Sequence, residues 1–258
     1  MADANGFRAS YRKLEARMQA QADADQSVFL PNPEPQGPVD HVFICMEPSL
    51  GRWARSPEEA KARVAAGFRN FISDIDTLIL HFCISEYLCE PGERYYITDL
   101  SKGAMLVKHA GAERTVRYDR WYALLIEELN LVTKQGAGIF ALGHPVARHL
   151  ARRGFPWPFT RLIHYSGLAA PARAAGIIGH EEEFGRFRGS VALERVLATA
   201  RQALDGFVPA HLLEESLAQA ARTQLSQSRQ QLMFIYKRAF EKWKLHRDVN
   251  LSTLSGDL

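Results

Sequence analysis

The sequence of 258 residues has few cysteines and no long apolar run. Cys45, Cys83 and Cys89 form no CxxC pair, so neither a disulfide framework nor a four-thiolate metal cluster is indicated, and reduced buried thiols are expected. His81 lies near two of them, but the spacing fits no common zinc pattern. No apolar run approaches the roughly 20 residues of a membrane-spanning helix, and the first residues lack a signal-peptide pattern. We therefore expect a soluble, cytoplasmic protein without metal, cofactor or membrane partner.

Acidic residues are absent between Leu129 and His180, a span of 52 residues in which 29 acids per 258 residues would place about six. Because a surface built from this span is electropositive, phosphate-bearing polymers are its commonest class of partner. A basic helix face without a partner is the alternative interpretation, and the net charge of +3 does not decide between them. The basic residues and histidines of the span are Lys134, Arg148, Arg152, Arg153, Arg161, Arg173, His144, His149, His164 and His180.

Hydrophobic patterning predicts a sheet that alternates with helices. Apolar runs typical of buried strands lie at 41–46, 94–98, 138–142 and 161–164, with helical segments between them. Such alternation predicts right-handed crossovers and a three-layer α/β/α fold with a central four-stranded parallel sheet. We expect an N-terminal helix and Pro-rich linker over 1–37, this α/β core over 38–173 and a C-terminal helical extension over 174–258, with Pro209 opening one long helical segment.

Ligands of open parallel sheets bind at the carboxyl ends of the strands. In this chain Glu47, Asp99, Gly143 and His164 fall at the ends of the four predicted strands. Four polar or conformationally permissive positions are therefore expected around one crevice.

Four segments lie at these strand ends: Cys45-Met-Glu-Pro-Ser49, Tyr96-Ile-Thr-Asp-Leu-Ser-Lys102, Ile139-Phe-Ala-Leu-Gly143 and Ile163-His-Tyr-Ser166. In their order and spacing they resemble motifs of the uracil-DNA glycosylase superfamily, and the resemblance covers roughly residues 38 to 170. The family typically carries GQDPY or GEAPG in the first motif, an Asn that reads the base at the end of the second strand, and HPS in the last.

The resemblance implies hydrolysis of an N-glycosidic bond, in which the site stabilises a cationic sugar and an anionic leaving base. Glu47 aligns with the acidic position and would orient the water, although it could instead cap the following turn. His164 would donate a hydrogen bond to the departing base, or be a structural histidine at a strand end. Ser166 would hold a target phosphate, and Leu168 would fill the space left by the extruded nucleotide.

Two departures from the family pattern concern the base. Asp99 stands where the family presents an Asn, and an ionised carboxylate only accepts hydrogen bonds, which suits the amino group of cytosine better than a carbonyl of uracil. Ser49 replaces the Tyr that crowds the C5 edge of the base in the GQDPY enzymes, so a C5 substituent has room. The sequence therefore predicts excision of a C5-modified cytosine, such as glucosylated hydroxymethylcytosine in phage DNA, as an anti-phage defence.

Further residues are candidates for base stacking and for DNA binding. Trp53 and Phe82 are candidates for stacking on the extruded base, with ordinary core packing as the alternative. The candidates for contacts with the DNA backbone, besides Ser166 and Leu168, are Ser101, Lys102, His144, Arg152 and Arg153.

Other functions fit the same pattern. The chain could be an ordinary uracil-DNA glycosylase of base-excision repair, or a protein of the same fold that binds DNA without cutting it, as a sensor. A hydrolase of small nucleotides is a further alternative, while the lack of a GxxxxGK[ST] loop argues against a nucleoside triphosphatase. DNA is the expected partner, and the sequence indicates no obligatory protein partner.

Overall fold

The computed structural model describes residues 4–51, 53–106, 111 and 113–254. Its contacts group the chain into two compact units. The first contains residues up to 73, 93–164 and 205–214, and the second contains 74–92, 165–204 and residues from 215 onward. The segments expected from the sequence follow one another along the chain, whereas each unit combines stretches that are distant in sequence.

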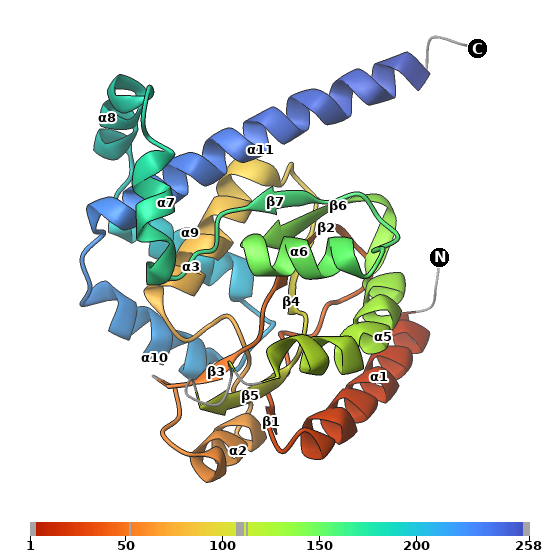
Figure 1. Ribbon diagram of the computed structural model, residues 1–258. Coiled ribbons are helices and arrows are strands. Elements are labelled where there is room, and N and C mark those ends of the chain that lie inside the picture. The colour runs from red at the N-terminus through yellow and green to blue at the C-terminus, as the bar shows by residue number, and fades with distance from the viewer. Residues whose placement is uncertain (1–3, 52, 107–110, 112, 255–258) are drawn as a thin grey trace. The chain divides into compact units, whose positions relative to one another are not determined.

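The first unit contains the predicted four-stranded parallel sheet (Figure 1). Its order is β4-β2-β6-β7, so the first strand of the sheet in the chain lies between the second and the third. The prediction of a central parallel sheet followed by C-terminal helices is therefore confirmed. The strands are β2 (Val39–Cys45), β4 (Tyr95–Asp99), β6 (Thr133–Leu142) and β7 (Thr160–Leu162).

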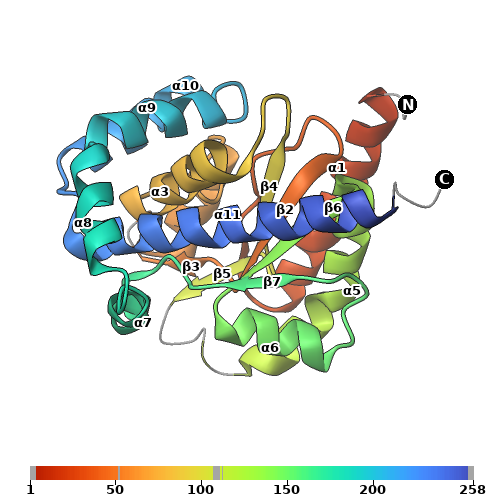
Figure 2. The same ribbon diagram turned by 90° about the horizontal axis from the view of Figure 1, so that it is seen from above.

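One face of this sheet is covered by α1 (Ala4–Ala24), α5 (Arg114–Val132) and α6 (His144–Arg152). Tyr11 of α1, Leu129 of α5 and Leu150 of α6 join the sheet residues Val42 and Ile139 in one apolar cluster. Figure 1 and Figure 2 show α1 running beside α5, and their facing side chains form a second cluster around Trp121. The predicted N-terminal helix is thus part of the core of the first unit.

The predicted Pro-rich linker is extended, since residues 30–38 form neither helix nor strand. It is nevertheless packed on the unit, because Asn32 is 1% exposed and its Nδ2 donates to the hydroxyls of Tyr96 at 3.2 Å and Thr98 at 3.4 Å. Helix α2 (Pro57–Ala65) begins as predicted, with Ser56 Oγ accepting from the backbone of Glu59.

A small second sheet in the first unit was not predicted. It has the order β1-β5-β3, with β1 (Val28–Phe29) antiparallel and β3 (Ser49–Leu50) parallel to β5 (Gly103–Leu106). Strands of two residues leave no periodic pattern in the sequence. Only glycine fits at Gly103, because a Cβ there would lie 2.2 Å from Ser27 Oγ.

The second unit is helical. Helix α3 (Ile75–Cys83) begins with a capping box between Asp74 and Thr77 and continues as a π-helical turn, Ile84–Leu88. Figure 2 shows α3 between α9 and α11, and it contacts both. The other elements of the helical segment are the 3₁₀ turn Gly167–Ala169, α7 (Ala170–Ala175), α8 (Glu181–Ser190), α9 (Leu193–Leu204), α10 (Ala210–Ala221) and α11 (Gln227–Leu254).

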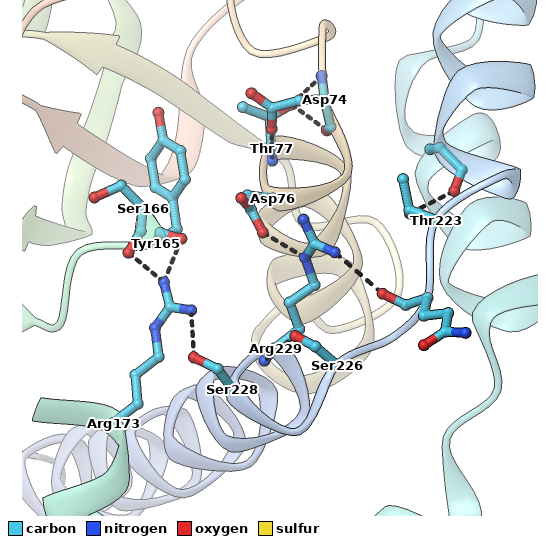
Figure 3. A network of polar contacts seen from close by, with 12 residues as sticks. Asp74, Asp76, Thr77, Tyr165, Ser166, Arg173, Thr223, Ser226, Ser228 and Arg229 are labelled. Atoms are coloured by element: carbon cyan, nitrogen blue, oxygen red, sulfur yellow. Dashed lines mark hydrogen bonds and ion pairs between the residues drawn. The ribbon is translucent and has the colours of Figure 1, made fainter. Parts of the chain in front are cut away.

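The long segment predicted after Pro209 is helical, and it is divided into two helices, α10 and α11. Between them Thr223 Oγ1 donates to the carbonyl of Ala220, and Ser226 Oγ accepts from the backbone of Arg229 (Figure 3). These side-chain bonds end one helix and begin the next. No helix in the described part of the chain is both long and apolar enough to cross a membrane.

Candidate functional site

The carboxyl ends of the four parallel strands lie at the same level of the sheet. The registers of the strands establish this, and they also place the following residues Met46, Leu100, Gly143 and Ile163 next to one another along one edge. In sheets of this order ligands typically bind at the carboxyl ends where the chain reverses its direction of winding, here between β2 and β6. The paired residues are Cys45 with Asp99, Ile44 with Ala141, and Leu142 with Leu162.

Glu47 follows β2 at this edge, and its two carboxylate oxygens have different surroundings. Oε1 lies 2.8 Å from a guanidinium nitrogen of Arg114 and 3.8 Å from one of Arg117, both on α5. Oε2 is buried and has no hydrogen-bond partner among the described residues. The side chain is only 4% exposed. Burial raises the pKa of Glu47 above its ordinary value, while the two arginines oppose this shift.

A carboxylate held in this way has one anchored oxygen and one oxygen that can accept a hydrogen bond. A buried acceptor without a partner costs about 1–3 kcal/mol, so this arrangement is unfavourable unless a ligand or water satisfies it. It is suited to hold a water molecule at the end of β2.

Asp99 is the last residue of β4 and is 3% exposed. Its Oδ2 accepts a hydrogen bond of 2.7 Å from Asn70 Nδ2. Burial raises the pKa of Asp99 to about 8, with Lys102 opposing and Glu47 adding to the shift. Burial therefore favours the neutral acid form of Asp99, which both donates and accepts a hydrogen bond, over the ionised carboxylate expected from the sequence.

Asp99→Asn is expected to flatten the pH dependence of stability between about pH 4 and 8. A carboxyl whose pKa is raised on folding stabilises the fold fully below its unfolded pKa of about 3.9, and this contribution is lost as the pH rises through the folded value of about 8. Asn has no proton to lose. Urea unfolding of both proteins across this range measures the difference, and parallel profiles would contradict a neutral Asp99.

Asn70 fixes the position of the Asp99 carboxyl. While its Nδ2 binds Asp99, its Oδ1 accepts from the backbone N–H of Phe71 at 2.9 Å. Phe71 has a φ of +61°, which is uncommon for a bulky residue and is typically retained where the surroundings enforce it. Both polar ends of Asn70 are therefore engaged, and its orientation is set by the loop after α2.

Gly143 and His164, at the ends of β6 and β7, are in contact. A Cβ on Gly143 would lie 3.3 Å from the Cβ of His164 and 3.6 Å from its Cδ2, and Gly143 has a φ of +95° that favours glycine. The imidazole of His164 thus packs over the backbone where β6 turns into α6. This part of the predicted convergence agrees with the structure.

Two of the residues predicted to bind the DNA backbone are buried within the first unit, which corrects that hypothesis. Lys102 is 2% exposed and its Nζ donates to Thr98 Oγ1 and, at 2.9 Å, to Glu128 Oε2. Ser101 is fully buried and its Oγ accepts from the backbone of Gly103. Neither side chain is available to a phosphate.

The two aromatic candidates for base stacking have packing roles instead. Trp53 is 7% exposed, stacks on Phe68 with centroids 4.9 Å apart, and donates its indole N–H to the carbonyl of Ser49. Phe82 belongs to α3 in the second unit and is fully buried against the edge of Tyr87. Ser49, by contrast, is exposed at the edge of the small sheet.

Ser166 and Leu168 belong to the second unit, where Arg173 holds their segment (Figure 3). Arg173 is 2% exposed, and its Nη2 donates to the carbonyls of Tyr165 and Ser166. Its Nη1 donates to Ser228 Oγ on α11 at 3.2 Å. Leu168 is 96% exposed, and its proposed insertion into DNA stays a prediction.

His144, Arg152 and Arg153 are exposed on or next to α6, as binding to a polyanion requires. Arg152 donates to Asp119 Oδ1 at 2.7 Å, and Arg153 lies 3.7 Å from the same atom and over the ring of Tyr122. Asp119 on α5 therefore neutralises part of this charge.

Sequence reasoning missed Asn70 and Arg114. Asn70 lies in a stretch interpreted as helix, although Gly67 and Asn70 are residues typical of turns and could have indicated a loop. Arg114 begins α5 far along the chain from Glu47, and no sequence signal connects them.

Neither the cysteines nor similarity to known proteins identifies a further functional site. Cys45 and Cys83 are buried as expected, and burial raises the pKa of both thiols, whereas Cys89 is only half-buried. Within the described ranges no group of three or more His, Cys, Asp or Glu side chains could hold a metal ion. Comparison of the chain with protein-family models, curated proteins and solved structures found no match.

Proposed function

We propose that this protein is a DNA glycosylase, which rotates a pyrimidine out of DNA and hydrolyses its N-glycosidic bond to leave an abasic site. The proposal rests chiefly on Glu47, whose carboxylate has one oxygen anchored by Arg114 and the other buried with no partner among the residues that the structure describes. The resemblance of the four strand-end motifs to the uracil-DNA glycosylase superfamily supports it further.

In this mechanism Glu47 positions the attacking water. Oε2 accepts a hydrogen bond from the water, and the negative charge of the carboxylate stabilises the positive sugar that develops as the bond breaks. Arg114 orients the carboxylate, and its charge favours the ionised form because it opposes the effect of burial on the pKa of Glu47. His164, packed over Gly143, donates a hydrogen bond to the departing base.

Asp99 reads the base in the proposed complex. As a neutral acid it accepts from the N4 amino group of cytosine and donates to N3, and as a carboxylate it still accepts from N4. Uracil offers a carbonyl and an imide proton, so it pairs with the neutral acid only. A cytosine is thus accepted in both protonation states, whereas recognition of uracil ends as the pH rises through about 8.

The preferred substrate in this proposal is a cytosine modified at C5, such as the glucosylated hydroxymethylcytosine of phage DNA, which places the protein in anti-phage defence. The exposed, small Ser49 leaves space where a Tyr would crowd the C5 edge of the base. Base-excision repair of uracil and DNA sensing without catalysis are the alternatives that the experiment distinguishes.

Duplexes containing uracil, cytosine, hydroxymethylcytosine or glucosylated hydroxymethylcytosine, followed by cleavage of abasic sites, test the proposal directly. We expect strand breaks at modified cytosine and, above about pH 8 where Asp99 is ionised, a gain of activity on uracil for Asp99→Asn. Release of uracil alone would contradict the substrate, and an Asp99→Asn variant with wild-type preference would remove Asp99 from base reading. Salt-dependent DNA binding without product from any duplex would favour the sensor.

A further inference from the structure

The exposed face of α6 carries a row of basic side chains. His144, Arg148 and Arg152 are spaced by four residues, so they lie above one another on one face of the helix, and all three are exposed. Val146 and Leu150 on the opposite face are fully buried in the core of the first unit. From His144 to Arg152 the helix rises by eight steps of 1.5 Å, so the row is about 12 Å long.

Arg161 on β7 widens this row. It is exposed, and its Nη1 lies 3.4 Å from His144 Nδ1. The basic row is defined here as His144, Arg148, Arg152 and Arg161. It belongs to the span without acids, and within the described residues neither Arg148 nor Arg161 forms an ion pair with an acid.

Asp119 is the acid that faces the row. Its hydrogen bond from Arg152, together with the charges of Arg152 and Arg153, lowers the pKa of Asp119, so it is ionised at neutral pH. It therefore competes with an incoming anion for Arg152, and the row has two unopposed arginines and one that is partly neutralised.

The position of the row connects it to the candidate site. Helix α6 begins at His144, directly after Gly143 at the end of β6, so the row starts at the strand edge where Glu47 and Asp99 lie. The first turn of a helix also presents unpaired N–H groups to an anion.

We propose that the basic row on α6 and β7 docks the phosphodiester backbone of duplex DNA and leads it to the strand edge. This deepens the proposed function, because it names how the same site receives its polymer. One strand of the duplex carries a phosphate for about every 3.4 Å of axial rise, so more than one phosphate falls within the 12 Å length of the row. Insertion into a membrane is disfavoured, because the apolar face of α6 is buried in the core and the exposed face is charged.

The salt dependence of DNA binding tests the row. Binding of an unmodified 20-base-pair duplex is followed by fluorescence anisotropy at several salt concentrations for wild type, Arg148→Ala and Arg161→Ala. Loss of one phosphate contact is expected to reduce the slope of log K against log salt by about 0.9, which corresponds to about eightfold weaker binding at 0.1 M salt. Arg12→Ala, which removes an exposed arginine of α1 with the same change in net charge, is the control and is expected to bind like wild type.

Asp119→Asn should have the opposite effect, with tighter binding and a steeper slope, because Arg152 and Arg153 lose their competing acid. Unchanged slopes for both arginine variants, equal losses for Arg12→Ala, or tighter binding of an RNA duplex of the same sequence would each overturn the proposal. Binding of the unmodified duplex requires no bond cleavage, so the two proposals can fail separately. A reduced salt slope for Arg148→Ala and Arg161→Ala, together with no abasic product from any duplex, would support DNA binding by the basic row and contradict the glycosylase.

Discussion

Glu47→Gln is expected to lower the rate of base release by about 10²- to 10⁴-fold, the range typical for loss of a positioned acid–base group. The substitution keeps the size of the side chain but removes the negative charge that would stabilise the developing sugar cation. It also replaces a carboxylate, with two acceptor oxygens, by an amide with only one. Since the amide can still contact Arg114, binding of DNA should change far less than turnover.

Single-turnover release of modified cytosine at saturating enzyme measures this effect without a contribution from binding. Glu58→Gln, an acid of the same unit at the exposed start of α2, is the matched control and should release base at the wild-type rate. Equal melting temperatures would show that Glu47→Gln is folded. A folded Glu47→Gln variant with wild-type turnover would require another residue to place the water.

Glu128→Gln is expected to lower the free energy of unfolding by about 3–5 kcal/mol, the cost of breaking a buried ion pair from one side. The side chains of Lys102 and Glu128 are 2% and 1% exposed, with Nζ and Oε2 at 2.9 Å. Glu128 also accepts from the hydroxyls of Tyr96 at 2.8 Å and Thr98 at 2.7 Å. An amide leaves the ammonium of Lys102 buried without a counter-charge.

The neighbouring residue supplies the control for this prediction. Glu127 pairs with Arg17 at 2.7 Å, but the two side chains are 50% and 59% exposed, so Glu127→Gln should cost less than about 1 kcal/mol. Urea unfolding of both variants compares the same Glu→Gln substitution at two neighbouring positions, one buried and one exposed. Lys102→Met combined with Glu128→Leu should recover part of the loss, because no unpaired charge remains. Equal stability of the two single variants would contradict the burial of the pair.

This buried pair also bears on the candidate site. Lys102 and Thr98 lie on either side of Asp99 in the chain, and both are bound to Glu128 of α5. The charge of Lys102 opposes the rise in the pKa of Asp99, and that of Glu128 adds to it. The network therefore fixes the end of β4 and influences how readily Asp99 ionises.

Local sequence patterns predicted the elements of the sheet well. The continuous apolar run that became β2 is buried on both faces, which only a strand inside a sheet explains at this length. Ser56 and Pro57 placed the start of α2, because capping and a fixed φ act within one turn. The two-residue strands and the end of α10 were not predicted, since they depend on partners distant in the chain.

The candidate site was predictable only in part. The carboxyl ends of the strands lie along one edge in any parallel sheet. The topology alone therefore predicted that Asp99, Gly143 and His164 lie along the same edge. Lys102 was interpreted as a DNA contact because it follows a strand end, yet it lies inside the unit, paired with an acid 26 residues away. A lysine has the same sequence signature in either role, and only its partner distinguishes them.

By itself the sequence determined which segments are strands and helices, that the sheet is parallel, and that one span lacks acids, because these depend on local pattern and composition. The tertiary structure alone decided which charges are neutralised and which remain available. Glu128 forms a buried ion pair with Lys102, and Arg114 pairs with Glu47. Asn70 donates a hydrogen bond to Asp99, and Asp119 pairs with Arg152. The ionisation and reach of a side chain depend on its burial and on charges within a few ångströms, and folding brings these together from positions far apart in the chain.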